Sequence, residues 1–401
     1  MKNSPALLTF FLIASIIASS QRPDKLHQRS ILADTHNDIL SSAMLEGKDI
    51  SHRINEGHSD LDRWKEGGVD VQFFSVWTGE RARTPQGFYQ DAIHEINLLD
   101  TLVHKNPDRI VLARTYNDVK KAVKKGKLAA LIGVEGGHMI EDDLSKLEEL
   151  YKRGMRYMTL TWNNSTSWAS SAMDEASLNP SEGGTLETPK GRKGLTGFGK
   201  EVVRKMNELG IIVDLSHTGE QTFYDAIATS SKPVLLSHSS VWNICPAFRN
   251  VKDEQIKAVA RNGGVICINF YSGFIDSNFA KRMNELEGTK GKQIRDSLQQ
   301  YYDAAKMNEI WRQRFSAELE PFRPTLSKLV DHIDYIVKLV GDDYVGIGSD
   351  FDGVSSLPVG LDDVTTYPKI TEELMRRGYS KKSIRKILGG NVMRVMKANF
   401  K

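Results

Sequence analysis

Cysteine is scarce in this sequence. The 401 residues include only two, Cys245 and Cys267. Two cysteines exclude a disulfide-rich scaffold and a cysteine-based zinc finger, because both need more. A single disulfide between them is compatible with an oxidising compartment, and the sequence leaves open whether that bond forms.

A large excess of one charge is also missing. The chain has 54 Lys and Arg against 51 Asp and Glu, so its formal net charge is +3. Binding to a nucleic-acid backbone requires a concentration of positive charge, and we therefore expect no nucleic-acid partner. With 40% hydrophobic residues, the chain has enough apolar side chains to fold rather than stay disordered.

Long apolar runs are missing after the first twenty residues. Before that point, Lys2 precedes an almost unbroken apolar run from Ala6 to Ala18. The run is short for a membrane span, and a positive charge, an apolar run and small residues in this order are typical of a cleaved secretory signal. We expect a signal peptide over 1–20, a mature domain over 21–401, and export to the periplasm or the medium. No cysteine follows the run and the C-terminus lacks an apolar tail, so no stable membrane anchor is expected.

Short apolar segments recur through the rest of the chain, separated by amphipathic ones. The apolar segments are 31–34, 69–77, 128–134, 155–162, 211–215, 233–237, 264–270 and 344–349. The amphipathic segments are 86–105, 116–125, 142–153, 197–209, 219–229, 253–262 and 326–340. Alternating strands and helices favour parallel strands joined by right-handed crossovers. Eight strands in this arrangement predict an α/β fold, a (β/α)8 barrel of the TIM type.

Two connections are much longer than the others. Residues 165–196 follow the fourth predicted strand and are rich in Ser, Gly and Pro. Residues 276–324 precede the eighth strand and are charged, with a helical pattern. Long connections in a compact domain are usually functional. We interpret both as insertions in a single domain.

Histidine and carboxylate side chains follow the predicted strands. They are His36 and Asp38 after the first strand, Glu135 after the third, His217 after the fifth, His238 after the sixth and Asp350 after the eighth. The carboxyl ends of barrel strands share one rim, where catalytic residues gather. Imidazole and carboxylate groups together suit zinc. One such residue alone is commonly structural, but five strand ends that all carry them predict a metal site.

Five motifs, taken in chain order, resemble those of the membrane (renal) dipeptidase family of zinc peptidases. They are DTHND at 34–38, GVEGGH at 133–138, DLSH at 214–217, LSHS at 236–239 and GSDFDG at 348–353. The resemblance extends from about residue 31 to residue 400. It implies a (β/α)8 metallohydrolase with two zinc ions and a dipeptide substrate, and it suggests a homodimer.

The resemblance also implies a role for each motif residue. The implied zinc ligands are His36 and Asp38 for the first ion, His217 and His238 for the second, and Glu135 as a bridge between the two. Asp350 would be the acid/base that handles the proton of the attacking water. Arg249, within CPAFRN at 245–250, matches the family's arginine for the dipeptide carboxylate. A guanidinium suits that task because it can donate two parallel hydrogen bonds to a carboxylate.

One position departs from the family pattern. After the fourth strand the family commonly has a histidine that contacts the substrate carbonyl or the developing charge, whereas this chain has Trp162. An indole donates one N–H and cannot carry a proton. Either Trp162 shapes the pocket while Asn163 or Asn164 supplies the hydrogen bond, or substrate choice has shifted, or Trp162 only packs in its loop. Tyr271, just past the seventh strand, is a further candidate for lining the pocket.

These observations lead to one hypothesis and two alternatives. The leading hypothesis is an exported zinc dipeptidase that cleaves dipeptides with a free C-terminal carboxylate. The first alternative is another amidohydrolase on the same scaffold, acting on N-acyl amino acids, lactams or lactones. The second is a non-catalytic binding protein that retains the barrel, although its complete set of ligands would then be unnecessary.

Overall fold

The computed structural model describes residues 23–176, 193–298, 310 and 314–401. The predicted signal peptide at 1–20 lies outside these residues. Within the described ranges, no helix is both long enough and apolar enough to cross a bilayer.

Eight parallel strands close into a barrel, as predicted. They are β1 (Ala33–Asp34), β2 (Val71–Trp77), β4 (Leu128–Glu135), β5 (Met155–Thr159), β6 (Ile212–Asp214), β7 (Leu235–Ser239), β8 (Val265–Ile268) and β9 (Val345–Ile347). Pairing runs in the order β2-β1-β9-β8-β7-β6-β5-β4, and β4 pairs with β2 to close the ring. A ninth strand that the sequence analysis missed, β3 (Ile110–Leu112), adds to β4 outside this ring.

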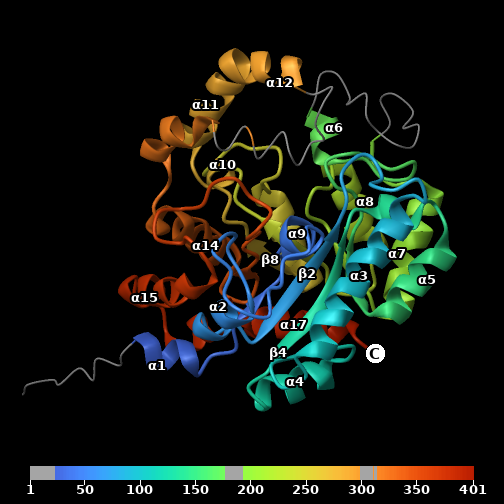
Figure 1. The fold of residues 1–401 in the computed structure, drawn as a ribbon, viewed down its shortest axis with the longest axis horizontal. Coiled ribbons are helices and arrows are strands. Elements are labelled where there is room, and N and C mark those ends of the chain that lie inside the picture. Colours follow the sequence, from blue (N-terminus) through green and yellow to red (C-terminus); the bar gives the residue numbers. More distant parts are fainter. Residues whose placement is uncertain (1–22, 177–192, 299–309, 311–313) are drawn as a thin grey trace, which may run out of the picture.

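Helices surround the barrel, and seven of them follow the predicted segments closely (Figure 1). The longer ones are α3 (Phe88–Lys105), α4 (Tyr116–Lys124), α5 (Leu144–Arg153), α7 (Gly197–Leu209), α8 (Glu220–Thr229), α9 (Asp253–Asn262), α14 (Leu326–Val340), α15 (Pro368–Arg376) and α17 (Asn391–Asn399). Shorter helices are α1 (Pro23–Gln28), α2 (Leu61–Glu66), α6 (Ala172–Ala176), α10 (Ser272–Ile275), α12 (Lys292–Leu298) and α16 (Lys381–Arg385), and the ten-residue α11 (Ser277–Leu286) comes between α10 and α12. Helices α6 and α10–α12 lie together at the upper end of Figure 1, so the described parts of both long connections are at the same end of the molecule.

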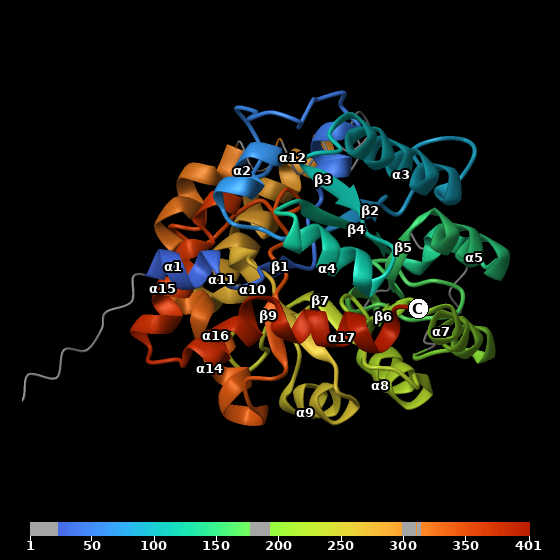
Figure 2. The same ribbon diagram turned by 90° about the horizontal axis from the view of Figure 1, so that it is seen from below.

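The interior of the barrel is filled by apolar side chains from seven of its eight strands. Phe73, Leu131 and Tyr157 are completely buried there, and the side chains of Val392 and Met396 from α17 join the same cluster. Figure 2 shows α17 lying across the barrel at the end opposite the insertions. The apolar face of α17 therefore closes the amino end of the barrel, which leaves the carboxyl ends of the strands as the place for a site. Cys245 and Cys267 are buried and free.

An ion-pair network joins α14 to α15. Arg377, directly after α15, donates to Asp331 and Asp334 of α14 at 2.8 and 2.6 Å and to Glu373 at 2.8 Å. Hydrogen bonds from Arg376, and then from Arg377 and Ser327, lower the pKa of Glu373 to about 2, although partial burial opposes them. Arg377 and Glu373 at its centre are only slightly exposed, so their pairing contributes more to stability than an open surface pair does.

We predict that Glu373→Gln lowers the free energy of unfolding by about 1–3 kcal/mol at pH 7. The folded-state pKa lies below the unfolded value of 4.5, so the contribution is complete above pH 4.5 and is lost as the pH falls toward 2. Chemical denaturation of both proteins between pH 7 and pH 2.5 measures the difference, which should shrink across that window. The exposed neighbour Glu372, changed to Gln, is the control. A difference that does not depend on pH would contradict the role of the Glu373 carboxylate.

Candidate metal centre

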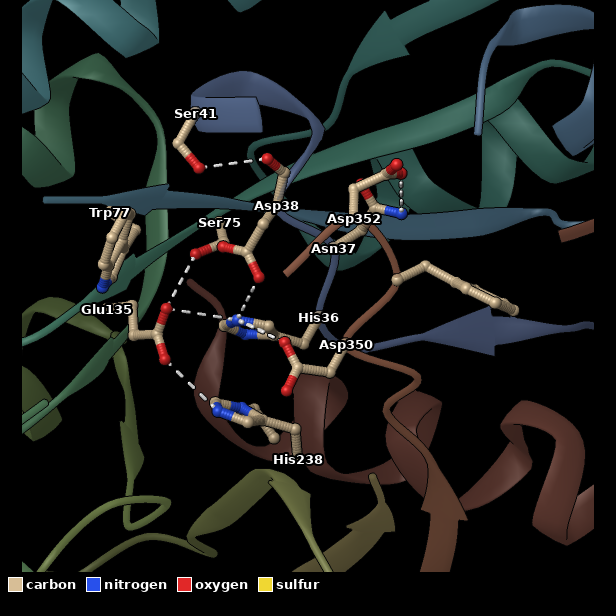
Figure 3. A network of polar contacts seen from close by, with 12 residues as sticks. His36, Asn37, Asp38, Ser41, Ser75, Trp77, Glu135, His238, Asp350 and Asp352 are labelled. Atoms are coloured by element: carbon tan, nitrogen blue, oxygen red, sulfur yellow. Dashed lines mark hydrogen bonds and ion pairs between the residues drawn. The ribbon is translucent and has the colours of Figure 1, made fainter. Parts of the chain in front are cut away.

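All six predicted ligand and acid/base residues meet at the carboxyl end of the barrel, and each is buried. They are His36, Asp38, Glu135, His217, His238 and Asp350. Two groups among them have ligand atoms within 4.8 Å of one another: His36, Glu135 and His238, and His36, Asp38 and Asp350. Figure 3 shows five of these side chains pointing toward a common centre.

The two oxygens of Glu135 face different partners. Oε2 lies 3.3 Å from His36 Nε2, on the side that also holds Asp38 and Asp350. Oε1 lies 2.8 Å from His217 Nε2 and 3.3 Å from His238 Nε2. One carboxylate therefore stands between two groups of nitrogen and oxygen donors. This is the arrangement that a bridge between two cations requires.

Backbone conformation helps to aim these side chains. His217 and Asp350 have left-handed backbones, with φ of 64° and 62°. Non-glycine residues adopt this conformation at a cost, and such residues cluster at functional sites. Gly353 leaves room for the carboxylates of Asp38 and Asp350 beside its backbone. A Cβ at this position would lie 2.1 Å from Asp38 Oδ2 and 2.7 Å from Asp350 Oδ1.

Each imidazole is held through its Nδ1 atom, which leaves Nε2 directed at the centre. His238 Nδ1 lies 2.8 Å from Ser237 Oγ, which donates its single proton to Asp214 at 2.6 Å. Ser237 must therefore accept a hydrogen bond from Nδ1–H. His217 Nδ1 lies 3.0 Å from the amide oxygen of Asn163, which fixes the same tautomer.

His36 is held from the middle of the barrel. Its Nδ1 lies 2.8 Å from the hydroxyl of Tyr157. Tyr157 reaches this position because Gly133 on the adjacent strand β4 has no side chain: a Cβ there would lie 2.0 Å from the ring. The sequence analysis did not identify Tyr157, Asn163 or Ser237 as partners of the ligands. Such contacts depend on how side chains pack beside one another, and the spacing of residues along one strand does not predict them.

The donor set fits divalent metal ions. His36 Nε2 and Asp38 Oδ1 are buried and make no hydrogen bond within the described part of the chain. His217 Nε2 and His238 Nε2 lie 2.9 Å apart, and both are lone-pair acceptors in the tautomers deduced above. Acceptors that face each other without a proton between them repel, and a cation between them removes that repulsion. The residues present therefore suit the ions that the sequence motifs imply.

Charge within the cluster shifts the pKa values of its carboxyl groups in opposite directions. Burial raises the pKa of Glu135, but the charge of His36 leads the interactions that hold it well below its ordinary value. Burial raises the pKa of Asp350 well above its ordinary value, and the carboxylates of Asp38 and Glu135 add to that effect while His36 opposes it. Asp350 Oδ2 accepts a hydrogen bond from Asn269 at 2.8 Å, which fixes the carboxyl group.

Arg249 lies beside the cluster as a buried cation. Its Nη2 donates to the carbonyl of His238 at 3.1 Å, and its guanidinium lies 5.4 Å from the ring of Phe274. Its Nε has no hydrogen-bond partner, and no carboxylate forms an ion pair with it among the residues that the structure describes. Burial lowers the pKa of Arg249 to about 10, while the more distant carboxylates of Asp350 and Glu135 oppose that shift. A buried guanidinium with a free N–H is suited to bind an anion.

The other two candidates occupy different positions. Trp162 lies at the cluster, with its ring 6.3 Å from the His217 imidazole. The amide oxygen of Asn163 accepts the hydrogen bond from His217. Both side-chain amide atoms of Asn164 are buried and make no hydrogen bond with any described residue. The hydroxyl of Tyr271 contacts Met283 Sδ at 2.7 Å, and its ring packs on Phe274, the residue beneath Arg249. Tyr271 thus contacts Phe274 rather than the predicted metal ligands, and its role in substrate binding stays a prediction.

We predict that Asn163→Ala weakens metal binding at the His217 and His238 side of the cluster by about 10- to 100-fold. Without the amide acceptor, His217 can rotate or change tautomer. Competition with a fluorescent chelator measures the affinity without relying on catalysis. Asn243→Ala, which removes an exposed amide bonded to Asp253, is the matched control. Equal affinity in the Asn163 variant and the unaltered protein would contradict a positioning role for Asn163.

Comparison with known proteins agrees with this geometry. The sequence model of the membrane dipeptidase family, peptidase family M19, matches residues 20–400. "Dipeptidase ataJ" of Aspergillus terreus is 34% identical over 394 residues, which cover 94% of this chain and 86% of that protein.

Solved structures share the fold. The probable dipeptidase PvdM from Pseudomonas aeruginosa has a TM-score of 0.76 at 23% identity, covering 94% of this chain and 97% of that one. A metallopeptidase from Rhodobacter sphaeroides, liganded with a phosphinate mimic of the dipeptide L-Ala-D-Ala, has a TM-score of 0.72 at 23% identity and covers 92% and 99%. At these identities the similarity shows the fold alone. The match over residues 20–400 goes further, and the chain belongs to the membrane dipeptidase family, peptidase family M19.

Proposed function

We propose that this protein hydrolyses dipeptides with a free C-terminal carboxylate and that it uses two zinc ions to do so. The observation that carries the proposal is the position of Glu135, whose two oxygens face two separate sets of donors. A single-metal site has no need for a buried carboxylate shared in this way.

The proposed zinc ligands are the residues assembled around Glu135. His36 and Asp38 would hold one ion, His217 and His238 the other, and Glu135 both. Bound zinc supplies Lewis-acid activation of water and of a peptide carbonyl. The protein contributes fixed imidazole tautomers and a buried environment, in which electrostatic interactions are stronger than in water.

Arg249 is the proposed partner of the substrate carboxylate. Its buried guanidinium has a free N–H and no carboxylate of the protein paired with it within the described ranges. A substrate carboxylate would supply the missing negative charge. Arg249 is fixed by its hydrogen bond to the His238 carbonyl. Binding of the substrate carboxylate to Arg249 would therefore also set how far the scissile bond lies from the carboxyl end of the substrate.

Asp350 is the proposed acid/base. Its carboxyl group lies at the cluster, with Oδ1 3.9 Å from His36 Nε2, and Asn269 holds the other oxygen. In this role Oδ1 accepts a proton from the attacking water and later gives it to the amine of the departing residue. Peptide hydrolysis needs both transfers, because an amine leaves as a neutral group only after protonation.

A dipeptide library tests the proposal directly. We expect hydrolysis of several free dipeptides, loss of that activity after treatment with a chelator, and much slower cleavage of the same dipeptides with an amidated C-terminus. N-acyl amino acids belong in the same assay, because they also present a free carboxylate to Arg249. Activity confined to N-acyl amino acids, lactams or lactones would support a different hydrolase, and binding without turnover would support a non-catalytic protein.

A further inference from the structure

Two tryptophans meet at the rim of the barrel beside the metal ligands. Trp77 is the last residue of β2, and Trp162 follows β5. Their rings pack edge to face with centroids 5.2 Å apart, and the ring of Trp162 lies 6.3 Å from that of His217. Trp162 is only half-buried. We call this pair the tryptophan wall.

Strand geometry directs Trp77 toward the site. Trp77 is paired in register with Glu135, and Ser75, two residues earlier, donates to Glu135 Oε2 at 3.3 Å. Side chains two residues apart on a strand share a face, so Trp77 points to the same side as Ser75 and Glu135. Figure 3 shows the Trp77 ring next to Glu135. The indole N–H of Trp77 is buried and makes no hydrogen bond with the described residues, so a donor is free beside the ligand cluster.

Arg83 and Glu95 fix the position of Trp77. The Arg83 guanidinium lies 5.6 Å from the centroid of the Trp77 ring and donates to the Trp77 carbonyl. Arg83 also pairs with the completely buried Glu95, which accepts a hydrogen bond from the Trp77 backbone N–H at 3.1 Å. The ring is therefore held before any ligand binds, which lowers the entropy lost on binding.

The wall and Arg249 occupy different parts of the rim. In the closed barrel, β1, β9 and β8 separate β2 from β7 on one side, and β4, β5 and β6 separate them on the other. Trp77 ends β2 and Arg249 follows β7, so the strands that carry these two residues are directly opposite. Trp162 follows β5, which only β6 separates from β7, so Trp162 comes between Trp77 and Arg249 around the rim.

We propose that the tryptophan wall binds the side chain of the substrate's N-terminal residue and favours dipeptides in which that residue is large and apolar. The inference rests on the proposed function. With the C-terminal carboxylate at Arg249, the scissile carbonyl belongs to the first residue, whose side chain then extends away from Arg249 toward the wall. Two indole faces stabilise an aromatic or large aliphatic side chain by burying it. To a carboxylate side chain they offer no positive charge and at most the single N–H of Trp77, which does not make up for the lost hydration of a full charge.

Three dipeptides test this assignment with zinc-loaded enzyme. Phe-Gly presents the apolar side chain at the first position, Gly-Phe presents it at the second, and Gly-Gly presents none. For Trp162→Ala we expect kcat/KM for Phe-Gly, relative to Gly-Gly, to fall about tenfold. The ratio of Gly-Phe to Gly-Gly should stay within about twofold, since that side chain lies on the Arg249 side. Trp162→Phe should keep most of the preference. Phe322→Ala, which removes an aromatic ring exposed on another segment, should keep all of it.

Three results would contradict the assignment of the wall to the substrate's first side chain. Unchanged preference for Phe-Gly, loss of preference at the second position, or an equal fall for all three dipeptides would overturn the assignment of the wall. Trp77→Phe, which keeps an aromatic ring on the strand, repeats the test if Trp162→Ala does not fold. Failure of the unaltered enzyme to cleave any dipeptide would overturn the proposed function, and this inference with it.

Discussion

Glu135→Gln is expected to abolish dipeptide hydrolysis and to reduce bound zinc below two ions per chain, while the fold is retained. The amide leaves one oxygen in place of the two that face His36 on one side and His217 and His238 on the other. Metal activation contributes several kcal/mol to such reactions, so kcat/KM should fall by about a thousandfold or more. Steady-state kinetics and elemental analysis of the same preparation measure the two effects.

Controls for this variant separate the bridge from general damage. Glu254→Gln on α9 changes an exposed carboxylate of the same type and should alter neither quantity. Circular dichroism verifies that the Glu135 variant is folded. Two zinc ions per chain at unchanged affinity in Glu135→Gln would show that this carboxylate is not the bridge.

Arg249→Ala should weaken the use of free dipeptides by about 2–5 kcal/mol, which is roughly 30-fold to several thousandfold in kcat/KM. The loss is large because the guanidinium is buried and its pairing with the substrate carboxylate would be desolvated. C-terminally amidated dipeptides cannot make that pair. We therefore expect the variant to treat free and amidated substrates nearly alike, and parallel kinetics on both forms measures the difference.

The conservative change Arg249→Lys distinguishes charge from geometry. Lysine keeps the positive charge but cannot donate two parallel hydrogen bonds, so an intermediate loss is expected. An equal loss for free and amidated dipeptides in Arg249→Ala would show that Arg249 supports the site in another way, for example through its contact with the His238 carbonyl.

The barrel was predictable from the sequence because its strands are buried on both faces. All eight apolar segments contain strands in the structure, and the helices at the seven predicted amphipathic segments begin and end within two residues of the predicted limits. Strand β3 was missed because it has three residues, only one of them fully buried, and lies outside the closed ring. A short, half-exposed edge strand has neither the apolar run nor the alternation that would reveal it.

The candidate site was predictable only in part. Ligands that directly follow apolar strands can be located from the sequence, because parallel strand ends share one rim. Their supporting contacts depend on lateral packing instead. Tyr157 reaches His36 only because Gly133 on the neighbouring strand leaves room, and Asn163 meets His217 through loop conformation. The register of Trp77 with Glu135 could have been anticipated from strand alternation once the two strands were known to pair.

Zinc titration of metal-free enzyme tests the central claim most directly. The protein is stripped with a chelator, and dipeptide hydrolysis is measured as zinc is returned in known amounts. The proposed bridged pair predicts no activity without metal and a plateau at two zinc ions per chain. Full activity in the stripped enzyme, or a plateau at one ion with no further binding, would contradict a two-zinc site built around Glu135.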